Sequence, residues 1–413
     1  MDTGGPTVAI VGIGRVGLPL ALFLAARGCR VHGVDHDEAY VRRLLETRRM
    51  PFREIGAQPV LEAVLGRSFF PGSDLSVVAR CTFVIVTIGT PIDEHMNPVL
   101  GPVEQIFRDM APHLQPGQTV ILRSTVSPGT TGYLARVLEQ CRTPGAAPGG
   151  VHLAFCPERI AQGHSLEELA EIPQIVGGVD APSTESAARF FARFGISVLE
   201  TDAMSAELAK LFSNMYRYID FAVANEFMML ATEHDRNIFE ILSLVNQGYK
   251  RGGIKRPGLT GGPCLYKDGF FLIERTPYPE LISNAWKINE SVPAWLISRI
   301  EQVRPVEGAV VGLFGMTFKR NSDDVRNSLS FKFLKILRRK GAQVVAHDPF
   351  VRPDTLLEAL RAEILVFATN HDAYAEWGLE GLRRRARRGA LVCDPWDIFG
   401  TRRIVFRLDQ NMP

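Results

Sequence analysis

The segment Gly261–Asp268, with the sequence GGPCLYKD, contains the side chains that are best suited to covalent chemistry. Its thiol follows a Gly-Gly-Pro turn, and a lysine and an aspartate come three and four residues later. If a helix begins near Cys264, the helix dipole and Lys267 both favour the nucleophilic thiolate. Asp268 then lies one turn further along and could act on a bound water or a proton. Taken alone, the segment also fits a buried loop cysteine without a chemical role.

A second group of side chains, all but one of them polar, precedes this segment. They recur at three- and four-residue spacing and therefore share one stripe of a helix: Glu207, Lys210, Asn214, Tyr218, Phe221 and Asn225. Lys210 and Asn214 stand among apolar neighbours, where burial is costly unless the group is paired or functional. Both side chains could stabilise an oxyanion. The alternative is a solvated helix face with an extended lysine side chain.

A glycine-rich turn, Gly12-Ile-Gly14-Arg-Val-Gly17, follows the predicted strand Thr7–Val11 and opens a predicted helix, Leu18–Ala26. Glycines at these places permit a tight turn, close approach of a pyrophosphate and close packing of helix on strand. Asp35 ends the next strand, at the spacing of an acid that binds a ribose 2′-hydroxyl, so the pattern favours NAD over NADP. The alternative is a structural glycine turn.

Polar residues also end two later strands, as Ser124-Thr125 and Pro157-Glu158-Arg159. Ligands of doubly wound sheets lie at the carboxyl ends of the strands. Thr125 and Glu158 are therefore expected to face a nicotinamide and the reacting carbon.

The elements that position these groups follow an α/β, all-α, α/β order. Predicted strands are Thr7–Val11, Arg30–Val34, Phe83–Ile88, Thr119–Ser124, His152–Cys156 and Gln174–Val176, then Ala309–Phe314, Gln343–His347, Glu363–Ala368 and Ala390–Asp394. Their continuous apolar character indicates parallel sheets covered on both faces. We predict two Rossmann-like doubly wound domains, 1–200 and 305–413, joined by a helical domain, 201–304.

The central region contains neither glycine nor proline from Ile196 to Gln247. It predicts a helix of about 30 residues that begins after an N-cap at Asp202, and a second helix that begins near Asn237. A helix of this length is expected to link two domains and to pack against a partner chain, so we predict a homodimer.

Bulk composition excludes several classes of protein. The chain has 413 residues, a formal net charge of +2 and 46% hydrophobic residues, which is typical of a globular protein that binds neither nucleic acid nor an acidic membrane. No apolar run approaches the length of a membrane span. The six cysteines show no metal-ligand spacing. We therefore expect a cytoplasmic protein with reduced thiols and no metal site.

Several ordered motifs together resemble the UDP-glucose/GDP-mannose dehydrogenase family over essentially the whole chain. The matching segments are Gly12–Ala21, Gly89–Pro91, Ser124–Thr131, Cys156–Arg159, Ala206–Asn214, Gly261–Asp268 and Phe318–Ser328. The sequence departs from the usual family pattern at Arg15, Tyr266, Ser322 and Leu329, none of which is a proposed catalytic group.

The resemblance implies a four-electron oxidation of a nucleotide-sugar C6 alcohol to a carboxylate with two NAD. It makes Cys264 the nucleophile, Lys210 and Asn214 the oxyanion-stabilising groups, Asp268 and Glu158 the groups that handle water and protons, and Thr125 a group that positions water or cofactor. The implied cofactor contacts are Gly12, Gly14, Arg15, Val16, Gly17, Asp35, Thr90, Thr125, Lys267 and Arg326. The implied substrate contacts are Glu158, Arg159, Lys210, Asn214, Tyr249, Arg251, Gly261, Phe318 and Lys319, with UDP bound by the C-terminal domain.

The substrate implied by the resemblance is a UDP-N-acetylhexosamine. Three segments have sequences that are similar to those of family members of that type: Pro157–Leu169, Ala224–Leu230 and Gly261–Asp268. UDP-glucose and GDP-mannose remain alternatives within the family. Outside it, a two-electron hydroxyacid dehydrogenase would also pair a Lys and an Asn on a helix, but would need neither Cys264 nor a second α/β domain. An inactive NAD-binding sensor is a further alternative.

Overall fold

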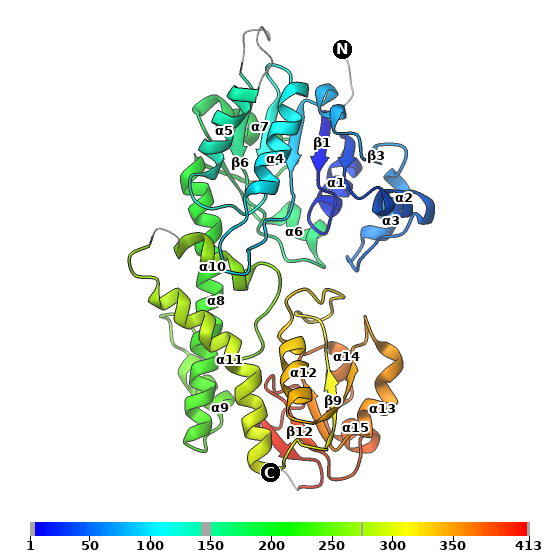
Figure 1. The fold of residues 1–413 in the computed structure, drawn as a ribbon, viewed down its shortest axis with the longest axis vertical. Helices are drawn as coiled ribbons and strands as arrows, with labels where there is room; N and C mark the ends of the chain where they lie inside the picture. The colour runs from blue at the N-terminus through cyan, green and yellow to red at the C-terminus, as the bar shows by residue number, and fades with distance from the viewer. Residues whose placement is uncertain (1–4, 142–149, 274–275, 411–413) are drawn as a thin grey trace. The chain divides into compact units, whose positions relative to one another are not determined.

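The computed structural model describes residues 5–141, 150–273 and 276–410, and it divides into two compact units. The first unit comprises Met1–Ser213 with Phe270–Arg275, and the second comprises Asn214–Gly269 with Thr276–Pro413. Figure 1 labels the elements of both units. The predicted division into three domains stays a prediction.

The first unit contains an eight-stranded sheet in the order β3-β2-β1-β4-β5-β6-β7-β8. The strands are β1 (Thr7–Val11), β2 (Arg30–Val34), β3 (Phe69–Gly72), β4 (Phe83–Val86), β5 (Thr119–Leu122), β6 (His152–Phe155), β7 (Gln174–Gly178) and β8 (Val198–Asp202). Neighbouring strands pair in parallel, except that β6 and β7 are antiparallel.

Helices cover both faces of this sheet because successive residues of each strand point to opposite sides. The helices are α1 (Gly17–Ala26), α2 (Glu38–Thr47), α3 (Ala57–Val64), α4 (Gly101–Met110), α5 (Thr130–Cys141), α6 (Ser165–Glu171) and α7 (Ala181–Ala192). Val8 and Ile10 pack in a core with residues of α1, α3 and α7. Ala9 and Val11 pack in a second core with residues of α4 and α5.

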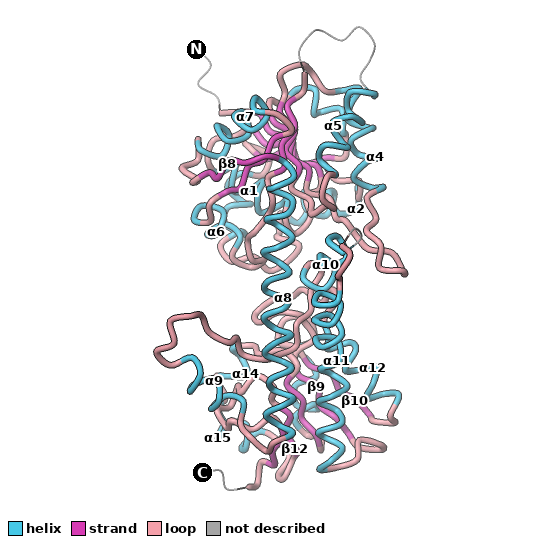
Figure 2. The backbone as a smooth tube through the Cα atoms, turned by 90° about the vertical axis from the view of Figure 1, so that its left-hand side faces the viewer, coloured by secondary structure: helices cyan, strands magenta, loops and turns pink. Residues whose placement is uncertain are grey.

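The predicted long helix is present as α8 (Ala203–Glu233), with 31 residues, and Figure 2 shows it as one uninterrupted helix. It begins where the Asp202 carboxylate accepts a hydrogen bond of 2.9 Å from the Ser205 amide. The next helix, α9 (Ile238–Asn246), begins after an N-cap at Asn237, as predicted. Two further helices follow, α10 (Leu265–Ile273) and α11 (Glu280–Val303).

The second unit contains a five-stranded sheet in the order β10-β9-β11-β12-β13. Its strands are β9 (Val310–Phe314), β10 (Gln343–His347), β11 (Ile364–Phe367), β12 (Leu391–Cys393) and β13 (Val405–Arg407), and its helices are α12 (Leu329–Arg339), α13 (Leu356–Leu360), α14 (Asp372–Ala375) and α15 (Gly378–Arg385). One face packs on α9, α11, α12 and the end of α8, and the other packs on α13, α14 and α15.

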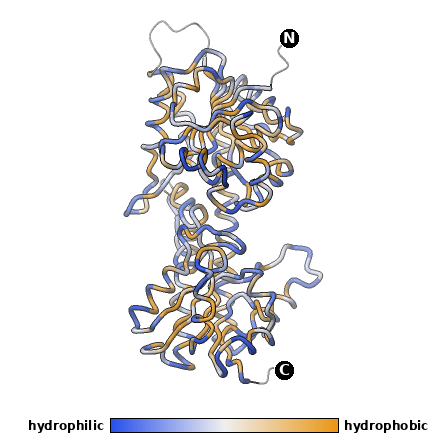
Figure 3. The backbone as a smooth tube through the Cα atoms, turned by 90° about the vertical axis from the view of Figure 1, so that its right-hand side faces the viewer, coloured by the Kyte–Doolittle hydropathy of each residue, from blue (hydrophilic) through white to orange (hydrophobic). Residues whose placement is uncertain are grey.

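The predicted α/β class with a central helical region is confirmed. Figure 3 shows apolar residues in orange along the strands of both sheets, where the buried cores lie. Strands β3, β8 and β13 were not predicted, and β12 and β13 form an antiparallel pair. Strands β3 and β8 lack a continuous apolar run. The sequence of β3 is FFPG, and that of β8 is VLETD, with partly or fully exposed residues throughout. Among the described residues, no helix meets the length and hydropathy that a membrane crossing requires.

Candidate functional site

The glycine turn of the first unit has the geometry that its sequence predicts. Gly12 has a φ of +92°, a conformation that L side chains rarely adopt. A Cβ on Gly17 would lie 1.9 Å from the Gly12 carbonyl oxygen, so only glycine lets α1 begin this close to β1. A Cβ on Gly14 would meet nothing within 4 Å, which leaves room for a ligand at the middle of the turn.

Asp35 follows β2 and lies directly beside this turn. Its carboxylate accepts hydrogen bonds of 3.1 Å from the amides of Ile13 and Asp37. The hydroxyl of Tyr40 donates to the carbonyl of Ile13 at 2.8 Å and holds the turn from the other side. Arg15 lies over the ring of Phe52, with 5.0 Å between its guanidinium carbon and the ring centroid. An open glycine turn with a fixed carboxylate beside it fits the phosphates and ribose of a dinucleotide.

The ends of β4 and β5 are joined through Thr90. Its hydroxyl donates to the Thr125 carbonyl at 2.6 Å, so these two predicted contact residues lie together. The α8 residue Glu207, almost fully buried, fixes the segment that follows Thr125. It accepts hydrogen bonds from the amides of Gly129 (2.6 Å) and Thr131 (2.7 Å). Burial raises the pKa of Glu207.

Glu158, after β6, lies in a buried polar cluster that the sequence did not reveal. Arg123 donates to its carboxylate at 2.5 Å and to the Gln174 side chain at 2.8 Å. Lys210 of α8 donates to the Glu158 backbone carbonyl. The structure therefore brings Lys210 and Glu158 together, but through the main chain of Glu158. Arg159 donates to the Pro173 carbonyl, and burial lowers its pKa.

The nucleophile predicted in the second unit, Cys264, is exposed and stands immediately before the first residue of α10. Its carbonyl accepts hydrogen bonds from the amides of Lys267 (3.1 Å) and Asp268 (3.0 Å), as in a first helical turn. A helix therefore begins directly after Cys264, which meets the condition on which the sequence argument for the thiolate depends. A thiol at this place lies at the positive end of the helix dipole, which favours the thiolate.

One turn further on, Asp268 is fully buried and is held by two donors. Asn214 of α8 donates to one carboxylate oxygen at 2.6 Å, and the Lys267 ammonium lies 3.2 Å from the other. Three of the predicted site residues therefore meet within the second unit, directly behind the cysteine. A buried carboxylate with both oxygens bound is a fixed charge that can orient a water or accept a proton.

The turn before Cys264 packs against the segment that follows β9. A Cβ on Gly262 would lie 2.6 Å from the ring of Phe318, so the ring rests on the glycine backbone. The Gly262 amide donates to the Asn327 carbonyl at 3.1 Å, and a Cβ on Gly261 would lie 2.5 Å from the same oxygen. Phe318 and Gly261, predicted as substrate contacts from distant parts of the sequence, thus belong to one cluster.

The remaining predicted residues have other surroundings. Tyr249 and Arg251 are exposed in the segment after α9. Arg326 forms an ion pair with the buried carboxylate of Asp324 at 2.7 Å, and the bond to Asp324 raises the pKa of Arg326. Lys319 is partly exposed beside Phe318.

Arg123 was the main residue that sequence reasoning missed in the first unit. The available signal was an arginine at the end of an apolar strand, directly before Ser124 and Thr125. Asp348 and His371 were missed in the second unit, although each follows a strand of the second sheet. No group of three His, Cys, Asp or Glu residues suited to a metal ion occurs within the part of the chain that the structure describes.

Three models of one family match the chain in order. The NAD binding domain of the UDP-glucose/GDP-mannose dehydrogenase family matches residues 6–195, the central domain matches 204–291, and the UDP binding domain matches 312–401. The glycine turn and Asp35 lie in the first match, Cys264 and Asp268 in the second, and Phe318 and Lys319 in the third.

Named relatives agree over nearly the full length. The chain is 30% identical over 398 residues to a UDP-N-acetyl-D-mannosamine dehydrogenase of Methanocaldococcus jannaschii, covering 93% of this chain and 90% of the relative. It is 29% identical over 427 residues to an NDP-N-acetyl-D-galactosaminuronic acid dehydrogenase of Ralstonia nicotianae, covering 98% and 99%.

A solved structure has the same fold. The UDP-D-ManNAc dehydrogenase of Pyrococcus horikoshii superposes with a TM-score of 0.85 at 30% identity, covering 92% of this chain and 93% of that one. Matches to all three family models, together with these relatives, show that the chain belongs to the UDP-glucose/GDP-mannose dehydrogenase family and is an NAD-dependent nucleotide-sugar dehydrogenase.

Proposed function

We propose that this enzyme oxidises the C6 hydroxymethyl group of a UDP-N-acetylhexosamine to a carboxylate, with Cys264 as the covalent nucleophile. The observation that carries the proposal is the arrangement at the start of α10. An exposed thiol precedes the helix, and a fully buried carboxylate lies one turn behind it between Asn214 and Lys267.

The proposed reaction has two oxidations and one hydrolysis. NAD held at the Gly12–Gly17 turn and Asp35 would supply the hydride acceptor for each oxidation. The alcohol first loses a hydride and a proton to give the aldehyde. The Cys264 thiolate adds to the aldehyde carbon, and loss of a second hydride converts the thiohemiacetal to a thioester. Water then adds to the thioester carbonyl, and the C–S bond breaks to release the carboxylate and the thiol. Covalent capture retains the aldehyde and divides the oxidation into easier steps.

The polar residues have distinct parts in this reaction. Asn214 and the ammonium of Lys210 stabilise the oxygen that becomes negative in the tetrahedral intermediates. Asp268 orients and deprotonates the hydrolytic water. For Glu158 we propose a different part from the sequence prediction, because Lys210 contacts its backbone carbonyl rather than its carboxylate, which accepts from Arg123 at 2.5 Å and from the Ile160 amide at 2.9 Å. We propose that Glu158 is a structural charge that places its backbone carbonyl against Lys210.

The choice of an N-acetylhexosamine rests on the relatives. The two relatives described above are named as dehydrogenases of UDP-N-acetyl-D-mannosamine and of an NDP-N-acetyl-D-galactosaminuronic acid. Both names specify a nucleotide-linked sugar with an N-acetyl group.

The test measures NADH formed per sugar consumed, with limiting UDP-N-acetylmannosamine, UDP-N-acetylglucosamine, UDP-N-acetylgalactosamine or UDP-glucose in excess NAD. Two NADH per sugar and a uronic acid product are expected for an N-acetylated substrate. One NADH per sugar would overturn the thioester route. Turnover of UDP-glucose alone would overturn the substrate class. The Cys264→Ala variant is expected to form no acid.

We further propose that the enzyme is a homodimer formed through α8. An apolar stripe on this helix is exposed and consists of Phe212, Tyr216, Val223, Phe227 and Leu230. An apolar pocket lined by Phe227, Leu230, Ile241 and Val245 continues the stripe onto α9. Exposed apolar surface of this extent is typical of an interface. Light scattering is expected to give twice the chain mass, and the Phe227→Glu/Leu230→Glu variant is expected to be monomeric.

A further inference from the structure

Two buried side chains that the proposed reaction does not use lie at the carboxyl end of the second sheet. Asp348 follows β10 and His371 follows the end of β11, and both are fully buried. Strand β9 lies between β10 and β11 and continues into the loop 316–321, which contains Phe318 and Lys319. The pair therefore reaches this loop from both neighbouring strands, and the Asp348 carboxylate lies 3.1 Å from His371 Nε2.

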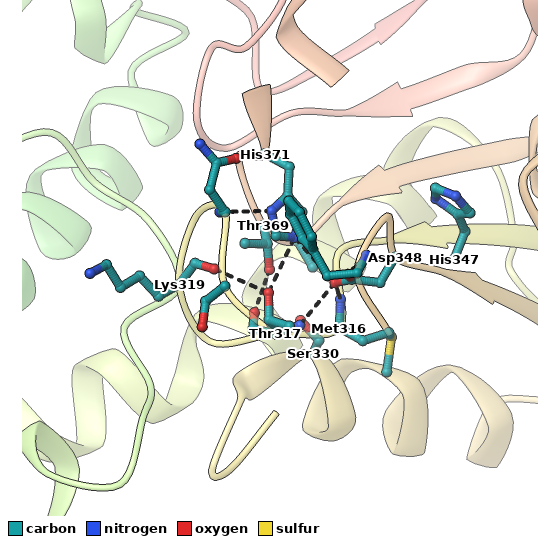
Figure 4. Close-up of polar contacts among 12 residues, drawn as sticks. Met316, Thr317, Lys319, Ser330, His347, Asp348, Thr369 and His371 are labelled. Carbon is teal, nitrogen blue, oxygen red and sulfur yellow. Dashed lines mark hydrogen bonds and ion pairs between the residues drawn. The ribbon is translucent and has the colours of Figure 1, made fainter. Parts of the chain in front are cut away.

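The two side chains bind the loop at its beginning and at its end. Asp348 Oδ2 accepts hydrogen bonds from the amides of Met316 (2.7 Å) and Thr317 (3.2 Å). His371 Nδ1 accepts one from the Asn321 amide at 2.9 Å. Figure 4 shows how these groups converge on the loop. Asn321 has a φ of +55°, so the chain reverses where His371 binds it.

Threonine hydroxyls fix the middle of the loop. Thr369, also after β11, donates to the Thr317 carbonyl at 2.6 Å. The Thr317 hydroxyl donates to the Lys319 carbonyl at 3.1 Å. The main chain of the loop is thus bound at residues 316, 317, 319 and 321, while the side chains of Phe318 and Lys319 are partly exposed.

The hydrogen bonds determine the tautomer of His371. Because an amide donates to Nδ1, this nitrogen carries no proton, and the ring proton is on Nε2 facing Asp348. An imidazolium would have a proton on Nδ1 and would lose the bond to Asn321. The neutral ring is therefore both acceptor for the loop and donor to the carboxylate.

The loop also contacts the turn that carries the nucleophile. The Phe318 ring rests on Gly262, two residues before Cys264, and the Phe318 amide donates to the Asp324 carbonyl at 3.0 Å. A displacement of residues 316–321 would consequently move the support of the Cys264 turn. Interiors transmit such displacements because they are densely packed.

We propose that Asp348 and His371 are positioning residues that hold the loop 316–321 so that nucleotide binding and placement of the Cys264 thiol depend on one another. The inference rests on the proposed function in one respect, that Phe318 and Lys319 bind the nucleotide. Neither Asp348 nor His371 touches the reacting atoms in this account. Their effect passes through the loop backbone and the Phe318 ring.

Two substitutions of His371 separate the bond of Nδ1 to Asn321 from the bonds of Nε2 to Asp348 and to the Thr317 hydroxyl. In His371→Asn the side-chain carboxamide lies near the place of Nδ1, so the backbone amide of Asn321 keeps an acceptor. In His371→Gln the side-chain carboxamide reaches toward Asp348, so the backbone amide of Asn321 loses its acceptor. We expect His371→Gln to weaken UDP binding about tenfold, as for one unsatisfied buried amide. We expect a smaller loss for His371→Asn. The control is Val392→Ala, a buried truncation in β12 that destabilises the same sheet away from the loop.

The experiment uses the full chain and three readouts: UDP affinity by calorimetry, hydrogen exchange of the 316–321 amides, and the rate at which iodoacetamide alkylates Cys264. The proposal expects faster exchange, a change of at least about threefold in alkylation rate and weaker UDP binding for His371→Gln, with NAD affinity unchanged. Equal values in His371→Gln and wild type would overturn it, and so would equal changes in Val392→Ala. If wild type binds no UDP, the proposed substrate class is wrong, while exchange and alkylation still decide the positioning role.

Discussion

The contact between Asn214 and Asp268 leads to a quantitative prediction about stability. Asp268 is fully buried, Asn214 donates to it at 2.6 Å, and Lys267 lies 3.2 Å from its other oxygen. A hydrogen bond to a buried charge contributes about 1.5–3 kcal/mol. Replacing Asp268 by Asn removes the carboxylate charge and its ion pair with the Lys267 ammonium, which costs about 3–5 kcal/mol of unfolding free energy in all.

A double-mutant cycle isolates the bond between the two side chains. Unfolding by urea is measured for wild type, Asn214→Ala, Asp268→Asn and the double variant. Because the amide oxygen in Asp268→Asn can still accept from Asn214, the cycle measures the part of the bond that depends on the charge, and we expect a coupling free energy of about 1–1.5 kcal/mol. The control is Asn225, a second buried asparagine of α8 that binds Gly258 and Asn289 instead, and its Ala variant should be additive with Asp268→Asn. Coupling within about 0.5 kcal/mol of zero for the Asn214 pair would refute the reasoning.

The same variant has a catalytic consequence. Without the Asp268 carboxylate, the hydrolytic water loses its base, and kcat should fall by about 10²–10⁴-fold. Mass spectrometry of Asp268→Asn after one turnover is expected to show a sugar thioester on Cys264. A low kcat without accumulation of the adduct would assign Asp268 to an earlier step.

Three further predictions concern the fold that supports the site. Gly17→Ala should destabilise the first unit by about 1–3 kcal/mol, because its Cβ would meet the Gly12 carbonyl oxygen at 1.9 Å, whereas Gly14→Ala should keep the stability and weaken NAD binding in a fluorescence titration. Arg123→Met should lower the unfolding free energy in urea by about 3–5 kcal/mol, because the buried Glu158 carboxylate loses its ion pair. Adding Glu158→Gln to this variant should restore part of the unfolding free energy. Burial lowers the pKa of His347 from 6.5 to about 4, so the contribution of the neutral His347 ring to folding stability is fully present above pH 6.5 and is lost, by about 3 kcal/mol, as the pH drops toward 4. Between pH 7 and pH 4.5, the unfolding free energy of His347→Phe should therefore decrease less than that of wild type. An equal decrease in the two proteins would contradict the role given to His347.

The sequence alone was sufficient for the local features of the site. Strand β1, the turn from Gly12 to Gly17 and Asp35 could be recognised because a tight turn between strand and helix leaves few residue types to choose from. The cap at Asp202 predicted the start of α8 because a capping side chain binds amides two or three residues away, and α9 begins next to Asn237, where a helix start was predicted.

Long-range partners could be decided only by the tertiary structure. Nothing in the spacing of Arg123, Glu158 and Gln174 shows that they meet, because the order of strands in a sheet depends on how whole helices and strands pack. The same holds for Asp348 and His371, which become neighbours because β10 and β11 flank β9. It holds also for the Phe318 ring on Gly262, where a glycine that reads as a turn residue proves to be a packing surface. Side-chain chemistry is local to the sequence, whereas the contacts that position it are made across the fold.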